Sequence, residues 1–347
     1  MSVFDCSSEM AAYHAERVTL SSADQQEMHD RRQAGRTRLN KALQRKGLPL
    51  PAVTASQGSY AMRTMVEDDD NDYDIDDGVY FSAADLADAH GTPLTPVQSR
   101  ERICDALKSD QRLKHDAEVR TNCVRQEYPE GYHIDVAVYR ERPPATSGGA
   151  PDGYELASGD RWIHSDARGV TKWFNGIVGE LNRDNPDGSQ LRRLVKLTKK
   201  LSRRQKDWKA ATTSGICITV LVIDCFSAVD GRDDEALLKT WQRIKARLSA
   251  DLTIKHPVLG TNLADRADTR VAFFRDCLGV AVNSLGVLEA QTCSRKDARK
   301  AWDTAFGTNF FGDQPAGDDD DDGGYKRSLF IPSSDVVQRN DSGRRFG

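Results

Sequence analysis

Asp74 and Asp76 have the residue type and the spacing of a pair that binds a divalent metal ion. They flank Ile75, and a two-residue step along a β-strand returns a side chain to the same face. Two carboxylates held side by side attract hard cations, and Mg²⁺ is commonly bound by one or two carboxylates together with substrate phosphates. An isolated Asp-x-Asp pair is more often a solvated turn, but this one lies among apolar residues such as Tyr73 and Val79, where an unpaired carboxylate costs free energy. The pair therefore indicates a metal site.

Asp135 is the candidate for a third carboxylate. It alternates with Ile134 and Val136 in a stretch that has the pattern of a strand, so an adjacent strand could bring it beside the pair. Two ions about 3.5–4 Å apart can activate an attacking hydroxyl and stabilise a leaving oxygen in an in-line displacement. We therefore predict that Asp74, Asp76 and Asp135 are catalytic and metal-binding, with two Mg²⁺ ions, or Mn²⁺ in their place.

A Gly-Ser turn and a basic stretch are the candidates for phosphate binding. Backbone N–H groups and a hydroxyl in the turn upstream of the aspartates can contact phosphates, although Gly-Ser also marks ordinary turns. A basic helix is predicted over 191–209, with most of its cations on a solvated face, and one or two of its lysines could neutralise a triphosphate. A serine near the start of the next predicted helix could add a hydroxyl. The predicted nucleotide-binding residues are Gln57, Gly58, Ser59, Lys196, Lys199, Lys200 and Ser214.

The elements that must position these residues change in type along the chain. Polar sequence over 10–46 predicts one or two surface helices. The alternation of apolar residues and a helical period then predict, in chain order, strands over 52–56 and 72–81, a helix over 96–108, and strands over 119–125 and 133–139. After a Gly/Pro-rich loop the pattern is helical to about residue 306, with helices over 191–209, 216–226, 233–250, 268–290 and 295–306. The order predicts an α+β fold, in which a mixed sheet with helices precedes a helical lobe.

Composition narrows the class of protein. The chain has 347 residues, of which 29% are charged and 38% hydrophobic, as in a soluble protein that can bury a full core. No apolar run approaches the roughly 18 residues of a membrane helix, and acidic residues near the start argue against a signal peptide, so we predict a cytoplasmic protein. A formal net charge of −4 disfavours a dedicated nucleic-acid binder. Seven scattered cysteines without a Cys-x-x-Cys pair predict reduced thiols and no structural zinc.

The ordered combination of four segments closely resembles the bacterial cGAS/DncV-like nucleotidyltransferases (CD-NTases), and most of all their dinucleotide-cyclase branch. The four segments are Gly58–Tyr60, Asp74–Tyr80, His133–Val136 and Gly159–Phe174. The resemblance extends from about residue 53 to residue 311. It implies a polymerase-β-like nucleotidyltransferase core packed on a helical lobe, with the active site in the cleft between them.

The resemblance also implies an activity. Enzymes of this family join two or three NTPs into a cyclic oligonucleotide with release of pyrophosphate, and the product signals phage infection to a separate effector in CBASS defence. ATP and GTP are the expected substrates. Mapped onto this chain, Asp74, Asp76 and Asp135 take the metal-carboxylate roles, and Gly58-Ser59 takes the phosphate-turn role.

Domain limits and partners complete the expectations. The expected domains are 1–180 for the N-terminal helix and the core, 181–312 for the helical lobe, and 313–347 for a flexible acidic tail. The end of the chain at Gly347 resembles family tails that a ubiquitin-like E1/E2 partner conjugates to targets, and a frayed terminus without function is the competing interpretation. No membrane or dedicated nucleic-acid partner is expected. The alternative functions are a nucleotidyltransferase that modifies RNA or protein, and a non-catalytic nucleotide-binding regulatory protein.

Overall fold

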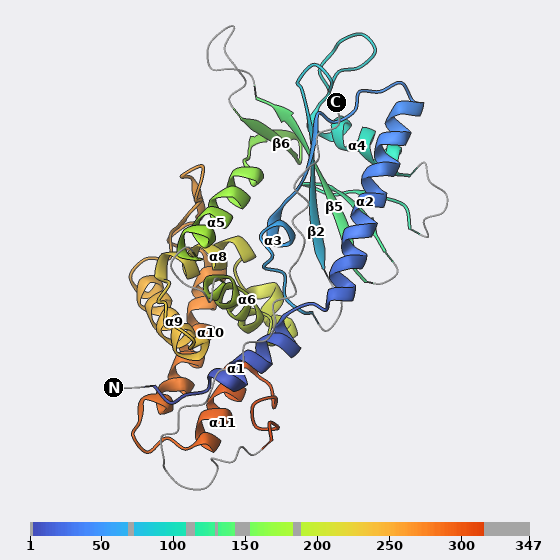
Figure 1. Ribbon diagram of the computed structural model, residues 1–347. Helices are drawn as coiled ribbons and strands as arrows, with labels where there is room; N and C mark the ends of the chain where they lie inside the picture. Colours follow the sequence, from blue (N-terminus) through green and yellow to red (C-terminus); the bar gives the residue numbers. More distant parts are fainter. Residues whose placement is uncertain are drawn as a thin grey trace. The chain divides into compact units, whose positions relative to one another are not determined.

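A mixed sheet holds the two strands predicted to carry the aspartates side by side (Figure 1). The computed structural model describes residues 3–68, 73–108, 115–128, 131–142, 153–182 and 189–315. Within these ranges the main path of the larger sheet has the order β1-β2-β5-β4-β3. The strands of this path are β1 (Val53–Ser56), β2 (Asp74–Phe81), β5 (His133–Glu141), β4 (Val124–Glu127) and β3 (Glu118–Val119). The strands predicted over 72–81 and 133–139 are thus its two central members.

The central strands β2 and β5 run parallel, whereas the neighbouring pairs in this sheet are antiparallel. A parallel pair needs a crossover connection, which is usually helical, and α4 (Pro96–Leu107) lies between the two strands in the chain. α4 begins with a proline and a capping box, in which Thr95 and Gln98 accept hydrogen bonds from each other's backbone N–H. The resulting register sets Asp76 directly beside Asp135.

The two faces of the sheet differ in chemistry. Leu39 of α2 (Ser22–Arg45) packs in one apolar core with Ile75 of β2 and with residues of α4. Burial of such a side chain contributes about 1.5–3 kcal/mol. α3 (Gly58–Ala61) lies against Asp76, and successive residues of a strand point to opposite faces. The aspartates therefore lie on the face that α2 and α4 leave uncovered.

Two strands replace the start of the helical region that was predicted after residue 153. β6 (Tyr154–Ser158) pairs with the second half of β5, and β7 (Arg161–His164) pairs with β6. Gly159 has a φ of 53°, in the left-handed region, and forms with Asp160 the short connection that closes this hairpin. The helical prediction was wrong here because strands of five and four residues are too short for a clear periodic signal.

The chain after β7 is mostly helical and builds a second apolar core. Its elements are α5 (Ala167–Asn182), α6 (Gln190–Ser202), α7 (Lys206–Ala211), α8 (Gly215–Cys225), α9 (Asp233–Ala250), β8 (Ile254–Lys255), β9 (Asn262–Ala264), α10 (Thr269–Leu285), the 3₁₀ turn η2 (Gly286–Glu289) and α11 (Arg295–Phe306). The helices predicted over 233–250 and 295–306 match α9 and α11 at both ends, whereas the one predicted over 191–209 is divided into α6 and α7. Trp241 and Trp302 are the largest fully buried side chains of this core.

The N-terminal segment belongs to this second core. α1 (Ser7–Tyr13) and the π-helical turn η1 (His14–Val18) follow each other, and Met10 and Tyr13 are buried with the helices. The Tyr13 ring lies 4.6 Å from that of Phe306, between centroids. The surface position predicted from residue 10 onward is therefore wrong for α1, because its few apolar residues recur at helical spacing and form a buried stripe.

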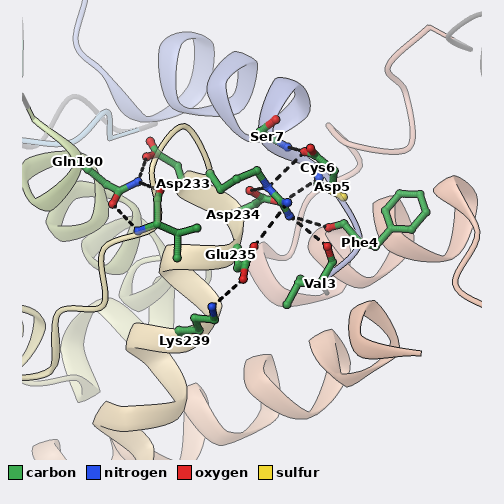
Figure 2. A network of polar contacts seen from close by, with 12 residues as sticks. Val3, Phe4, Asp5, Cys6, Ser7, Gln190, Asp233, Asp234, Glu235 and Lys239 are labelled. Atoms are coloured by element: carbon green, nitrogen blue, oxygen red, sulfur yellow. Dashed lines mark hydrogen bonds and ion pairs between the residues drawn. The ribbon is translucent and has the colours of Figure 1, made fainter. Parts of the chain in front are cut away.

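A polar network anchors the same segment to the start of α9 (Figure 2). Asp234 is fully buried and accepts a hydrogen bond from the Cys6 backbone N–H at 2.8 Å. Arg232 donates to both carboxylate oxygens of Asp234 at 2.9 Å, and also to the carbonyl oxygens of Val3 and Phe4. A carboxylate tolerates such burial only with partners of this kind. The network therefore fixes the N-terminal segment on the helical core.

α10 and η2 together form a long apolar helical stretch. Thr269–Glu289 is long and apolar enough to cross a membrane by length and composition alone, whereas no such run was expected from the sequence. Its buried residues, among them Phe274 and Leu278, pack in the helical core. Core packing therefore accounts for the apolar character of this stretch.

Candidate active site

The three predicted aspartates lie on one face of the sheet. Asp76 is the register partner of Asp135 across the parallel pair β2 and β5, and Asp74 is the partner of His133. Ile75, between the two aspartates of β2, is fully buried on the opposite face. The predicted proximity of a carboxylate from a neighbouring strand is thus present, and the parallel register is its cause.

The charges of these carboxylates are not equivalent. Burial raises the pKa of Asp76 to about 7, and the carboxylates of Asp135 and Asp74 add to the rise. The pKa of Asp74 is lowered instead, chiefly by its hydrogen bond with the His133 ring and also by Arg125. Asp76 therefore lies where a negative charge is least favourable unless a cation is near.

Arg125 supplies positive charge to this face and was not among the predicted site residues. Its Nε and Nη2 donate to the two oxygens of Asp135 at 2.8 and 2.7 Å, and Nη2 also donates to Asp74 Oδ1 at 2.8 Å. His133 Nε2 lies 3.0 Å from the same Asp74 oxygen. Arg125 comes from β4, where it is the antiparallel partner of Asp135. Only this cross-strand register, which no local sequence pattern encodes, could have identified it.

The turn before α3 packs directly on Asp76. Gly58 has a φ of 58°, and a β-carbon at this position would stand 2.0 Å from Asp76 Oδ2. The Gln57 backbone N–H donates to the Asp76 carbonyl oxygen at 2.9 Å, which fastens the turn to β2. Ser59 follows, half-buried, in the first turn of α3. Only glycine fits at residue 58, because any side chain would displace the carboxylate.

Gln57 lies beneath this turn, and its side chain is buried. Its Nε2 donates to the Tyr80 hydroxyl at 2.6 Å, and its Oε1 accepts from the Tyr139 hydroxyl at 3.1 Å. A β-carbon on Gly78 would stand 1.9 Å from Gln57 Nε2, so that glycine makes room for the amide. Both polar ends of the Gln57 side chain are thus used inside the core, where they position the turn. The nucleotide contact predicted for Gln57 stays a prediction.

The three candidate lysines of α6 reach different partners. Lys199 Nζ donates to the hydroxyl and the carbonyl oxygen of Thr64, on the segment that follows α3. Lys200 Nζ donates to the carbonyl oxygen of Glu67 at 3.0 Å, and Lys196 Nζ lies 3.5 Å from the Thr19 hydroxyl. Lys199 and Lys200 therefore hold the chain that leaves the turn, whereas a mainly solvated face was predicted for this helix.

Lys199 is the lysine whose charge acts on the carboxylate face. Burial lowers its pKa to about 7 and Arg203 adds to the fall, while Asp76 opposes it. A β-carbon on Gly215 would stand 3.5 Å from Lys199 Cε, so the lysine also lies at the start of α8. Ser214 caps that helix, since its hydroxyl accepts a hydrogen bond from the Cys217 N–H. Lys199 thus lies near the start of α8, which Ser214 caps, and the contact of both residues with phosphates stays a prediction.

The donor chemistry of this face fits a hard divalent cation. In the part of the chain that the structure covers, no three Asp, Glu, His or Cys side chains are arranged as a metal-binding group, and Asp74 is bound by Arg125 and His133. Carboxylate oxygens are nevertheless the ligands that Mg²⁺ prefers. The guanidinium between Asp74 and Asp135 shows that positive charge is accommodated on this face.

Comparison with known proteins identifies the sheet. Residues 53–139 match the family model of the cyclic GMP-AMP synthase DncV-like nucleotidyltransferase domain. These residues form a DncV-like nucleotidyltransferase domain. The match includes β1, the Gly58 turn, β2, α4 and most of β5, and with them each of the three aspartates. The resemblance to cGAS/DncV-like nucleotidyltransferases found in the sequence is confirmed.

Solved structures of nucleotidyltransferases extend the likeness to the helical lobe. The di-nucleotide cyclase DncV of Vibrio cholerae, in a mutant form, aligns with a TM-score of 0.67 and 17% identity over 88% of this chain and 97% of that chain. DncV in complex with the linear intermediate 5′ pppA(3′,5′)pG aligns with a TM-score of 0.66 and 17% identity, over 88% and 96%. CdnC of E. coli MS115-1 with ATP aligns with a TM-score of 0.64 and 17% identity, over 87% and 98%. At these identities the likeness shows the fold, and the predicted fold class is confirmed.

Proposed function

We propose that this protein is a cyclic oligonucleotide synthase, which joins two or three NTPs, ATP or GTP or both, and releases pyrophosphate. The observation that carries the proposal is the placement of Asp76 beside Asp135 on β2 and β5, with the Gly58 turn packed on Asp76. The likeness to DncV, which has been solved with a linear dinucleotide intermediate, and to CdnC, which has been solved with ATP, supports this substrate class.

The residues of this chain divide the reaction between them. Asp74, Asp76 and Asp135 would hold Mg²⁺ or Mn²⁺, which supplies charge neutralisation and lowers the pKa of an attacking hydroxyl. The backbone N–H groups of Gly58 and Ser59 orient the donor triphosphate. Catalysis then comes mainly from positioning and charge, as in other phosphoryl transfers.

One phosphodiester bond forms as one phosphoanhydride bond breaks. The acceptor ribose oxygen attacks the α-phosphorus, its proton passes to the Asp135 carboxylate, and the bond from the α-phosphorus to pyrophosphate breaks. Lys199 of α6 and Ser214, which caps α8, bind the leaving phosphates through a charge and a hydroxyl. The linear product then turns round, so that its own triphosphate becomes the donor for the second bond and the ring closes.

The decisive experiment follows the fate of labelled nucleotides. The full chain is incubated with Mg²⁺ and each labelled NTP, alone and in pairs, and then treated with phosphatase before chromatography and mass spectrometry. We expect a phosphatase-resistant cyclic product from the wild type and from Asp105→Asn, an exposed site on α4, and none from the isosteric Asp76→Asn. Transfer of the label to added RNA or protein instead would favour the first alternative function, and a lack of any NTP consumption would favour the non-catalytic one.

The biological setting rests on the family resemblance. We propose a cytoplasmic enzyme whose product is a second messenger that a separate effector reads in anti-phage CBASS defence. CdnC has been solved in a complex with HORMA. This complex supports the proposal that the protein described here also binds a protein partner. The predicted conjugation of Gly347 lies outside the described residues and stays a prediction.

A further inference from the structure

Arg125 makes a closed arrangement with two of the three carboxylates. Its guanidinium bonds Asp135 through two nitrogens, at 2.8 and 2.7 Å, and one of these nitrogens also bonds Asp74 at 2.8 Å. Parallel, two-pronged bonds of this kind are among the strongest that a carboxylate forms, because both partners are charged and their geometries match. In this respect the guanidinium takes the position that a bridging cation would have.

The hairpin of β3 and β4 directs Arg125 to this place. Arg125 is the register partner of Asp135, and its neighbours Val124 and Gln126 are buried. A strand sends alternate residues to opposite faces, so the buried neighbours fix the direction of the arginine. The side chain of Arg125 is 25% exposed and that of Asp135 12% exposed, so solvent screens the pair only in part.

A divalent ion and this guanidinium compete for the same oxygens. Each oxygen of Asp135 is already bonded by Arg125, and the two cations would repel each other at a shared carboxylate. An ion held by Asp76, Asp135 and Asp74 therefore requires that Arg125 withdraw from at least one of its partners. Two binding events that exclude each other have a coupling free energy, which lowers the apparent affinity of both.

We propose that Arg125 is an internal counter-cation of the carboxylate site, which neutralises Asp74 and Asp135 when no ion is bound and sets the metal affinity by having to be displaced. This inference rests on the proposed function, since it takes the three aspartates as the metal ligands. Arg125 is a positioning residue in this role. It keeps the carboxylates in place, and it makes occupation of the site depend on the concentration of the ion.

The test is the binding of Mn²⁺ alone to the full chain, followed through the spin-resonance signal of free Mn²⁺, together with the melting temperature with and without the ion. We expect Arg125→Ala to bind Mn²⁺ at least about fivefold more tightly than the wild type. Its melting temperature should fall without the ion, because repelling carboxylates are left unpaired, and recover when Mn²⁺ is saturating. Arg125→Lys, which keeps a charge but not the two-pronged geometry, should have an intermediate Kd.

Arg120→Ala is the matched control, because Arg120 lies on the same hairpin and pairs with Glu118 and Glu127, not with an aspartate of the site. Its Kd for Mn²⁺ should equal that of the wild type. An unchanged or weaker Mn²⁺ affinity in Arg125→Ala overturns the inference. If that variant does not fold, Arg125→Lys decides alone. A lower Kd for Mn²⁺ than that of the wild type supports the displacement of Arg125 by the ion, and an equal or higher Kd overturns it.

Asp76→Asn separates failure of this inference from failure of the proposed function. If this variant loses Mn²⁺ binding while Arg125→Ala binds no more tightly than the wild type, the metal site stands and only the role of Arg125 is wrong. If the wild type does not bind Mn²⁺, or Asp76→Asn binds it equally well, the carboxylates are not the metal site, and the proposed function fails with the inference.

Discussion

Lys199 donates hydrogen bonds from one nitrogen to both the hydroxyl and the carbonyl oxygen of Thr64, at 2.9 and 3.2 Å. Thr64 is fully buried and follows the Gly58 turn in the chain. α6 is therefore joined directly to the segment that leaves the turn. The positive charge of the same lysine acts to lower the pKa of Asp76 and so favours the negative form of that carboxyl. Lys199 therefore links the helical lobe to the turn and to the carboxylate face.

Lys199→Met should raise the KM for NTPs and lower kcat/KM by at least about tenfold, because one charge–phosphate contact contributes about 1.5–3 kcal/mol. The helix itself should persist, since Met is of similar length and a good helix former. Lys196→Met and Lys200→Met are the controls on the same helix, and we expect much smaller changes in KM from both. A large effect at Lys196 or Lys200 with none at Lys199 would move the phosphate contact to another lysine.

Gly58→Ala should abolish product formation and destabilise the fold by about 1–3 kcal/mol. Its β-carbon would meet Asp76 Oδ2 at 2.0 Å, in addition to the strain of a φ of 58°. Gly47→Ala is the matched control, because Gly47 has a φ of 64° and a β-carbon there would meet nothing within 4 Å. The control should cost about 1 kcal/mol of stability from strain alone and keep its activity. Chemical denaturation measures the stability of each variant, and the product assay measures its activity. Equal effects of the two substitutions would contradict the close contact between residue 58 and Asp76.

The half-buried His14 should make stability depend on pH. Burial lowers the pKa of His14 to about 4, Lys196 and Arg193 add to the fall, and Asp233 opposes it. Because the folded pKa lies below the unfolded value of about 6.5, the unfolded chain takes up the proton first. The contribution of neutral His14 to stability is thus fully present above about pH 6.5 and lost as the pH falls toward 4.

Comparison with His14→Gln, which does not titrate, isolates this effect. Between pH 7 and pH 4 the wild type should lose on the order of 2–3 kcal/mol more unfolding free energy than the variant. His90→Gln, at an exposed histidine, should follow the wild type. Urea denaturation at several pH values measures the difference, and parallel curves for the wild type and His14→Gln would rule the effect out.

The strands that carry the aspartates could be predicted from the sequence alone. Strands β2 and β5 have apolar side chains in alternation with the acidic ones, and this two-residue period separates the faces without any knowledge of the fold. The limits of α9 and α11 were equally clear, since both helices have long amphipathic runs and α11 begins with a capping box. Local signals of this strength need no tertiary context.

Residues whose role depends on a distant partner were not predictable. In the sequence Arg125 has the pattern of any arginine on a strand, and only the pairing of β4 with β5 brings it to Asp135. Gln57 reads as part of a phosphate turn, whereas packing turns its amide toward Tyr80. The lysines of α6 recur at three- and four-residue spacing, so helical geometry puts them on one side, and only the position of Thr64 distinguishes Lys199.

The contact of Tyr13 with Phe306 has a consequence for folding during synthesis on the ribosome. α1 is synthesised before the sheet, whereas α9 and α11, which complete its apolar surroundings, are synthesised after it. Contacts between residues so far apart in the chain form slowly, and chains generally fold from the N-terminal side as they emerge. The sheet can close its own core before α11 is synthesised, whereas Met10 and Tyr13 stay exposed until α11 has left the ribosome.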